Sequence, residues 1–238
     1  MSLEPTAVPR RGADRAIYTW AALAAVLIVF AGFARTYYLK GVFGSPALPG
    51  LLHLHGLVMT SWFILFVVQV RLAAVKRVDL HRRLGWLGAF LAVLVLSVGT
   101  ITAITAARLG HSPGPPPLVF MTIPLGDMVV FAVLMGLGLG YREQPAVHKR
   151  IMLLASLSLL TAAIARIPLE FIRTAGLPLY FGLLDLCLLT CVAIDTAKHR
   201  RLHPALGWGF FFIFASQVIR FLLAGTPQWL RFAAWLTG

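Results

Sequence analysis

Charged side chains inside long apolar stretches are the residues of this chain whose types could support chemistry. The charged ones are Asp127, Arg166, Asp185 and Arg220, and His55 joins them at the start of another apolar stretch. Each charge left near the centre of a bilayer costs about 2.5–3.5 kcal/mol on insertion scales. We therefore expect these groups to converge, facing one another or a wet cavity.

Two further polar residues share helix faces with the arginines. Glu170 follows Arg166 by four residues and Gln217 precedes Arg220 by three, spacings that place side chains together on a helix. The arginines would receive an anionic or carbonyl-bearing ligand, while the aspartates hold the arginines or relay protons. Purely structural Asp–Arg pairs are the alternative. The predicted ligand-binding residues are His55, Trp62, Asp127, Arg166, Glu170, Asp185, Gln217 and Arg220.

A transition-metal site is a second interpretation of the same residues. His53 or His55 with Asp127 and Asp185 would give nitrogen and oxygen ligands that suit zinc, manganese or iron. Because residues two apart do not share a helix face, both histidines could ligate one ion only if the helix start were unwound. The nearby arginines oppose a cation.

Haem b is the alternative cofactor, held by two histidines from different helices. Four histidines stand beside Lys, Arg or Pro at expected helix starts, where interfacial histidines among basic residues are the favoured interpretation. These four are His81, His148, His199 and His203.

Hydropathy predicts an all-α membrane protein with seven spans, because each apolar run is long enough to cross a bilayer as a helix. An N-terminal tail, residues 1–15, precedes the spans, which occupy residues 16–225. A short amphipathic segment, residues 226–238, follows at the outer interface. The expected spans are Ala16–Ala34, Leu51–Val75, Leu84–Ala107, Leu118–Gly140, Ile151–Ile172, Leu179–Ala197 and Ala205–Ala224.

Clusters of Lys and Arg predict the orientation. The tail and every second loop carry most of the basic residues, so these parts are expected in the cytoplasm, with the N-terminus inside and the C-terminus outside. His55 and the buried charges then lie in the outer half of the bilayer.

Composition limits the function classes. Of 238 residues, 59% are hydrophobic and 12% are charged, with a mean hydropathy of +0.86, which is typical of an integral membrane protein. The formal charge of +13 does not indicate nucleic-acid binding, because the basic residues occur in short clusters between apolar spans. No phosphate-binding loop or hydrolase motif occurs. Lipid and a small-molecule ligand are the expected partners, and a homo-oligomer is left open.

A weak internal repeat aligns the inner loops. His81, His148 and His203 each open an outward-going helix, which suggests three helix hairpins of one ancestry behind a first helix. Membrane proteins built from repeats often place a site between the repeated units.

Several motifs carry a resemblance to a known family. With His55-Gly56, Trp62, Gln69 and LHRRLGW, followed by HKRIMLLA, the chain resembles a family of uncharacterised bacterial multi-pass membrane proteins, over about residues 51–166. The HKRIM step is more weakly similar to membrane proteins of cytochrome oxidase maturation and to b561-type haem proteins. The resemblance implies a bacterial inner (cytoplasmic) membrane protein and no assigned activity.

These patterns lead to one hypothesis with two alternatives. The leading hypothesis is a protein that binds, senses or transports a small ligand through an outward-facing polar pocket, with Trp62 and Phe66 as its apolar floor. The alternatives are a metal- or haem-dependent redox protein or enzyme, and an assembly factor whose buried ion pairs are only structural.

Overall fold

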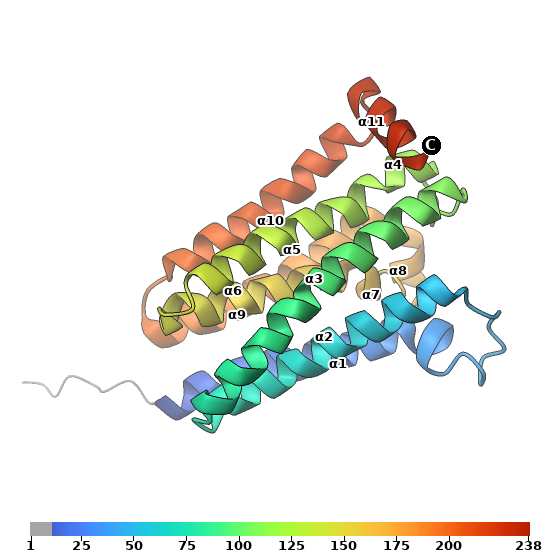
Figure 1. Ribbon diagram of the computed structural model, residues 1–238. Coiled ribbons are helices and arrows are strands. Elements are labelled where there is room, and N and C mark those ends of the chain that lie inside the picture. The colour runs from blue at the N-terminus through green and yellow to red at the C-terminus, as the bar shows by residue number, and fades with distance from the viewer. Residues whose placement is uncertain (1–10) are drawn as a thin grey trace, which may run out of the picture.

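A computed structural model gives the arrangement of the chain (Figure 1). It describes residues 11–238, except for the side chains of 11–15 and 173, and within residues 11–238 it contains helices but no strand. In chain order the elements are α1 (Arg11–Phe33), η1 (Ala34–Tyr38), α2 (Gly50–Ala74), α3 (Val78–Arg108), α4 (Pro117–Phe120), α5 (Thr122–Gly140), α6 (Pro145–Leu157), η2 (Ser158–Leu160), α7 (Thr161–Ile164), α8 (Glu170–Ala175), α9 (Leu177–His199), α10 (Pro204–Leu223) and α11 (Pro227–Thr237).

Seven helical spans in the described residues are long and apolar enough to cross a membrane, which confirms the prediction of a multi-pass membrane protein. The bundle exposes large apolar side chains along its length, including Trp20, Leu27 and Leu222, all at least 67% exposed. A surface of this kind suits lipid because hydrocarbon, unlike water, solvates it. The spans are Ala16–Tyr38, Gly50–Ala74, Val78–Arg108, Pro117–Gly140, Pro145–Ile164, Leu177–His199 and Pro204–Leu223.

The fifth span differs from its predicted range of Ile151–Ile172. Helix α6 passes through η2 into α7, and the helical run ends at Ile164. Pro168 explains the early end, since proline lacks a backbone donor and disfavours the helical conformation of the residue before it. Glu170 begins the separate helix α8, so the prediction that Glu170 and Arg166 share one helix face is wrong.

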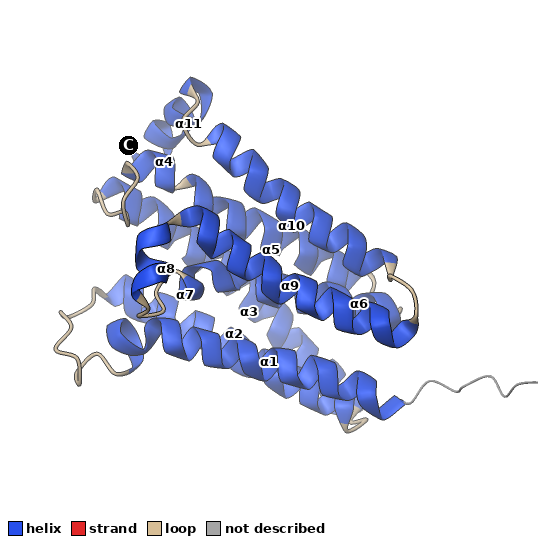
Figure 2. Ribbon diagram, turned by 180° about the vertical axis from the view of Figure 1, so that it is seen from behind, coloured by secondary structure: helices blue, strands red, loops and turns tan. Residues whose placement is uncertain are grey.

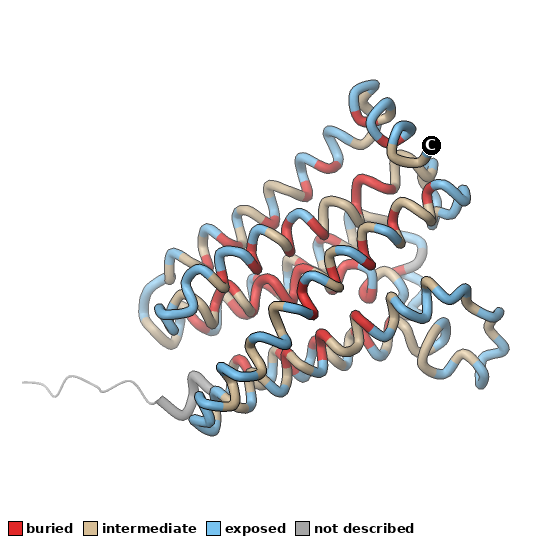
Figure 3. Tube along the Cα trace, in the orientation of Figure 1, coloured by how far each residue is buried: buried red, intermediate tan, exposed pale blue. Residues whose placement is uncertain are grey.

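The α6–α7 segment is the centre of the bundle. Helix α6 packs against α1, α5, α9 and α10, and α7 packs against α1 and α9. Of the seven spans, Pro145–Ile164 is the most buried, and buried positions concentrate on the helix faces that turn inward (Figure 3). Figure 2 shows α7 and α8 between α1 and α9.

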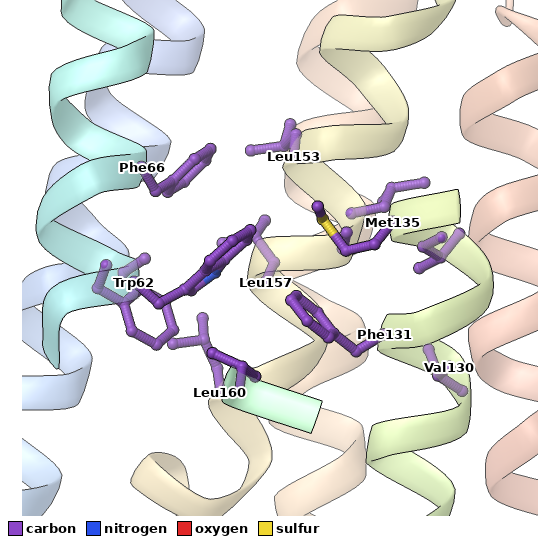
Figure 4. Packing of buried hydrophobic residues seen from close by; sticks show 14 of the residues in the cluster. Trp62, Phe66, Val130, Phe131, Met135, Leu153, Leu157 and Leu160 are labelled. Carbon is purple, nitrogen blue, oxygen red and sulfur yellow. The ribbon is translucent and has the colours of Figure 1, made fainter. Parts of the chain in front are cut away.

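The apolar core joins α2, α5 and α6 (Figure 4). The Trp62 ring of α2 meets the Phe131 ring of α5 edge to face, with centroids 5.0 Å apart. Leu157 and Leu160 of the central segment complete this contact. Aromatic pairs of this geometry add about 0.5–1.5 kcal/mol beyond the area they bury.

The two ends of the bundle differ in charge. One end, here called the basic end, carries the connections 75–77, 141–144 and 200–203 with the neighbouring helix starts. At the opposite end α11 covers α3 and α4, where the Trp229 Nε1 donates to the carbonyl of Leu118 at 2.8 Å. The positive-inside pattern predicts that the basic end is cytoplasmic.

Candidate functional site

Helices α5 and α10 are joined by an ion pair between two predicted site residues. Arg220 Nη1 donates to Asp127 Oδ1 at 2.6 Å, and the side chains are 5% and 12% exposed. Arg220 also donates to the Ile123 carbonyl and, through Nε and Nη2, to Ser216 Oγ, while its guanidinium lies over the Phe181 ring. Most of its donors are therefore used inside the protein, which leaves little capacity for a ligand.

Asp185 and Gln217 form a neighbouring contact between α9 and α10. Gln217 Nε2 donates to Asp185 Oδ1 at 2.9 Å, and Gln217 is buried while Asp185 is half-buried. Because Gln217 and Arg220 are one turn apart on α10, four of the eight predicted ligand-binding residues lie in adjoining contacts of α5, α9 and α10. This is the part of the expected convergence that the structure contains.

A second buried ion pair, which the sequence interpretation missed, joins α6 and α9. Arg150 Nε and Nη2 donate to Asp195 Oδ2 at 3.0 and 2.8 Å, and each side chain is 3% exposed. Tyr18 of α1 donates to Asp195 Oδ1, and the His199 ring lies 3.4 Å from Oδ2. Arg150 belongs to the HKR cluster, which the sequence interpretation assigned to the membrane boundary. Asp195 is a carboxylate inside an apolar span, so the free-energy cost of burying its charge could have marked it as a site residue.

The two ion pairs link the same two hairpins in opposite senses. The hairpin α5–α6 supplies Asp127 away from the basic end and Arg150 near it. The hairpin α9–α10 supplies the partners Arg220 and Asp195. Each hairpin thus gives one acid and one base, and the pairs fasten the hairpins together at two depths. Pairing neutralises four charges that lipid would not tolerate singly.

Arg166 lies outside these contacts. Its Nη1 donates to the Ala162 carbonyl at 2.8 Å, and its guanidinium lies 5.2 Å from the centroid of the Phe33 ring. In the described part of the chain no carboxylate forms an ion pair with Arg166, whereas Arg150 and Arg220 both have one. The expectation that all the buried charges meet is therefore wrong for Arg166.

Within the described residues, buried polar atoms without hydrogen-bond partners occur on α2 and α7, among other helices. The buried atoms His55 Nδ1, Trp62 Nε1 and Thr161 Oγ1 have no hydrogen-bond partner among the described residues. Trp62 packs against Leu160, which precedes Thr161 (Figure 4). Away from the basic end, α2 continues from Trp62 to His55, and the central segment continues from Leu160 through α7 to Arg166. We call these four residues, His55, Trp62, Thr161 and Arg166, the α2–α7 strip.

The predicted metal ligands do not form a cluster. No group of three or more His, Cys, Asp or Glu residues in the described range could hold a metal ion. Helix α2 is regular from Gly50, so its start is not unwound, and His53 is exposed beside Tyr37. Asp127 and Asp185 have Arg220 and Gln217 as partners. The metal site predicted from His53, His55, Asp127 and Asp185 is therefore not assembled.

Two surface hollows lie between the first three helices. One, of about 150 Å³, is lined by α1, η1 and α2, and the other, of about 490 Å³, by α2 and α3. Their linings are almost entirely apolar, and neither includes a predicted ligand-binding residue. Both open on faces that the apolar surface assigns to lipid.

The histidines at the basic end hold helix ends together. His81 Nδ1 is hydrogen-bonded to the Gln69 carbonyl at 3.3 Å, and His148 Nδ1 to the Gly138 carbonyl at 2.7 Å. His203 caps α10, accepting a hydrogen bond from the Ala205 backbone N–H at 3.2 Å. The His148 and His203 bonds satisfy backbone groups at helix ends, and the His81 bond ties the start of α3 to α2.

Comparison with known proteins supplies no relative from which a function could be carried over. A scan against protein-family models, a search of curated proteins and a search of solved structures found no match to this chain.

Proposed function

We propose that this multi-pass membrane protein binds a small anionic or carbonyl-bearing molecule at the α2–α7 strip, from the side opposite the basic end. The observation that carries the proposal is the unequal treatment of three arginines. Arg150 and Arg220 are neutralised within the protein, whereas Arg166 has no carboxylate partner in the described residues. A guanidinium with unused donors at the edge of an apolar bundle favours an anion.

The remaining polar groups of the strip suit an oxygen-bearing ligand. Trp62 offers an indole N–H and Thr161 a hydroxyl, while His55 offers a ring nitrogen, and none of these atoms has a partner in the described residues. A buried donor without a partner costs about 1–3 kcal/mol. A ligand oxygen that accepted from Trp62 or Thr161 would recover that cost, and the Phe131 ring beside Trp62 gives the apolar wall common to small-molecule sites.

The interhairpin ion pairs have a separate role in this proposal. Arg220 is paired with Asp127 across α10 and α5, and Gln217 is hydrogen-bonded to Asp185 across α10 and α9, so these contacts hold the three helices together. In this proposal these four residues, which the sequence predicted to bind ligand, instead have a structural role. In this proposal the basic end is cytoplasmic, as the positive-inside pattern predicts, and the strip faces the outer side of a bacterial inner membrane.

Ligand-dependent stability of the purified full-length protein tests the proposal. Thermal unfolding in detergent micelles is followed while acetate, succinate or inorganic phosphate is titrated at constant ionic strength. A ligand of the native state adds about 2.7 kcal/mol at a hundred times its Kd. Saturable stabilisation by at least one of these anions is expected for the wild type.

Matched arginine variants locate the effect. Arg166→Gln is expected to abolish the stabilisation, whereas Arg35→Gln is expected to retain it. Arg35 is a close control because it is exposed and its guanidinium lies 5.2 Å from the centroid of the Phe43 ring, the same separation as between Arg166 and Phe33. Equal responses of the two variants, or no saturable response of the wild type to any of the three anions, would refute the proposal.

A further inference from the structure

Two histidine rings from different hairpins lie close together at the basic end. His81 is the fourth residue of α3 and His148 is the fourth residue of α6. Their ring centroids are 6.2 Å apart and the ring planes are nearly perpendicular, at 87°. Neither ring takes part in the ion pairs of the interhairpin contacts or in the α2–α7 strip.

The hydrogen bonds of both rings fix where each proton resides. His81 Nδ1 and His148 Nδ1 each lie against a backbone carbonyl, which can only accept. Each neutral ring must then carry its proton on Nδ1 and a lone pair on Nε2. Gln69 Nε2 donates back to the His81 carbonyl at 3.2 Å and so steadies that helix start. Metal-ligating histidines have this arrangement, in which a carbonyl fixes the tautomer and ring orientation.

The separation of the rings, 6.2 Å between centroids, fits two imidazoles that share one metal ion. A metal–nitrogen bond is about 2.0–2.1 Å, and an imidazole centre lies about 1.1 Å beyond its nitrogen, so two imidazoles on opposite sides of one ion have centroids about 6 Å apart. We propose that His81 and His148, through their Nε2 atoms, bind one transition-metal centre at the basic end. Because Nε2 is already unprotonated in the neutral rings, binding releases no proton from them.

The residues around His81 and His148 bear on whether the metal is a free ion or the iron of a haem. In the described residues no third His, Cys, Asp or Glu completes a site, so its other ligands come from water or from a porphyrin. Arg82 and Lys149 directly follow the two histidines in the chain. Their positive charges disfavour a bare dication and favour a centre that brings anionic groups. A free metal ion and a haem iron would both be bound in the same way, through the imidazole nitrogens of the two histidines.

Metal retention by the full-length protein tests the proposal. Purified protein is incubated separately with Cu(II), Zn(II) and ferric haem, desalted, and analysed for bound metal and, with haem, for the visible spectrum of two-histidine ligation. One equivalent of at least one probe is expected to remain. His81→Gln and His148→Gln are each expected to weaken binding by more than about 100-fold, the upper range for losing only an outer-shell partner.

A control substitution at His203 and a chemical-protection experiment on the wild type complete the test. His203→Asn removes another histidine of the basic end but keeps a good helix cap, and it is expected to retain the metal. In the wild type, bound metal is expected to protect His81 and His148 from carbethoxylation, measured by mass spectrometry, while the exposed His53 and His111 still react. Retention of ion alone or haem alone identifies the source. No retained probe, or retention that His81→Gln and His148→Gln leave unchanged, would overturn the proposal, as would modification of both rings at the metal-free rate.

Discussion

The substitution Asp195→Asn removes the charge that neutralises Arg150 inside the bundle. Asp195 accepts from Arg150 at 3.0 Å and 2.8 Å, and both side chains are 3% exposed. Breaking a buried pair by removing one partner costs about 3–5 kcal/mol, because the other charge stays buried without compensation. Total stabilities of folded proteins are only about 5–15 kcal/mol. We therefore expect a large loss of stability.

Thiol labelling measures this loss at the site. Cys191 lies one turn before Asp195 on α9 and its side chain is buried, so its labelling rate under native conditions reports the free energy of opening. The control Asp79→Asn breaks an exposed pair with Arg77, at 3.6 Å, and is expected to change stability by less than about 1 kcal/mol.

A triple variant separates charge compensation from shape. Tyr18→Phe with Arg150→Met and Asp195→Leu removes both charges and the hydroxyl that donates to Asp195. Apolar replacement of a whole buried pair is often neutral or stabilising, so this variant is expected to recover most of the loss. A change below about 1 kcal/mol in Asp195→Asn, or a triple variant as unstable as the single one, would show that the pair does not fasten the hairpins.

Two further predictions concern the Asp127–Arg220 ion pair and the helix cap of α10. A Cβ at Gly126 would overlap the Arg220 side chain, so Gly126→Ala is expected to destabilise the protein by about 1–3 kcal/mol in thermal unfolding. Gly136→Ala, on the same helix with nothing near its Cβ, should instead be neutral or stabilising by up to about 1 kcal/mol, and equal effects would refute the steric reason. Burial and then the charge of Arg150 lower the pKa of His203 below its ordinary 6.5, so the unfolded chain takes up that proton first as the pH falls. The wild type should therefore lose stability below pH 6.5 relative to His203→Asn, measured by unfolding across pH, and parallel curves would contradict the capping role.

The spans could be predicted because lipid leaves the backbone few choices. A run of about twenty apolar residues in a bilayer must satisfy its backbone internally, and a helix does so. The fifth span shows the limit of this reasoning. Hydropathy extended this span to Ile172, but the helical run ends at Ile164 before Pro168, because hydropathy does not register a backbone conformation.

The candidate site could be predicted only in part, because a sequence shows which charges are expensive but not which helices are neighbours. Asp127 and Arg220 were recognised by their cost, and they meet as expected. Arg166 was placed with them by depth, although it lies beside α1 and over Phe33. Arg150 was hidden in a basic cluster that is typical of a membrane boundary, and only the packing of α6 against α9 revealed its partner.

Anion titration of two variants tests most directly where the ligand binds. Thermal unfolding with acetate, succinate and inorganic phosphate is compared between Arg166→Gln and the double variant Asp127→Leu with Arg220→Met. We predict that the double variant retains the saturable stabilisation of the wild type, because that pair is structural, and that Arg166→Gln loses it. Stabilisation that survives in Arg166→Gln but disappears in the double variant would place the site at the α5–α10 ion pair and contradict the assignment to the α2–α7 strip.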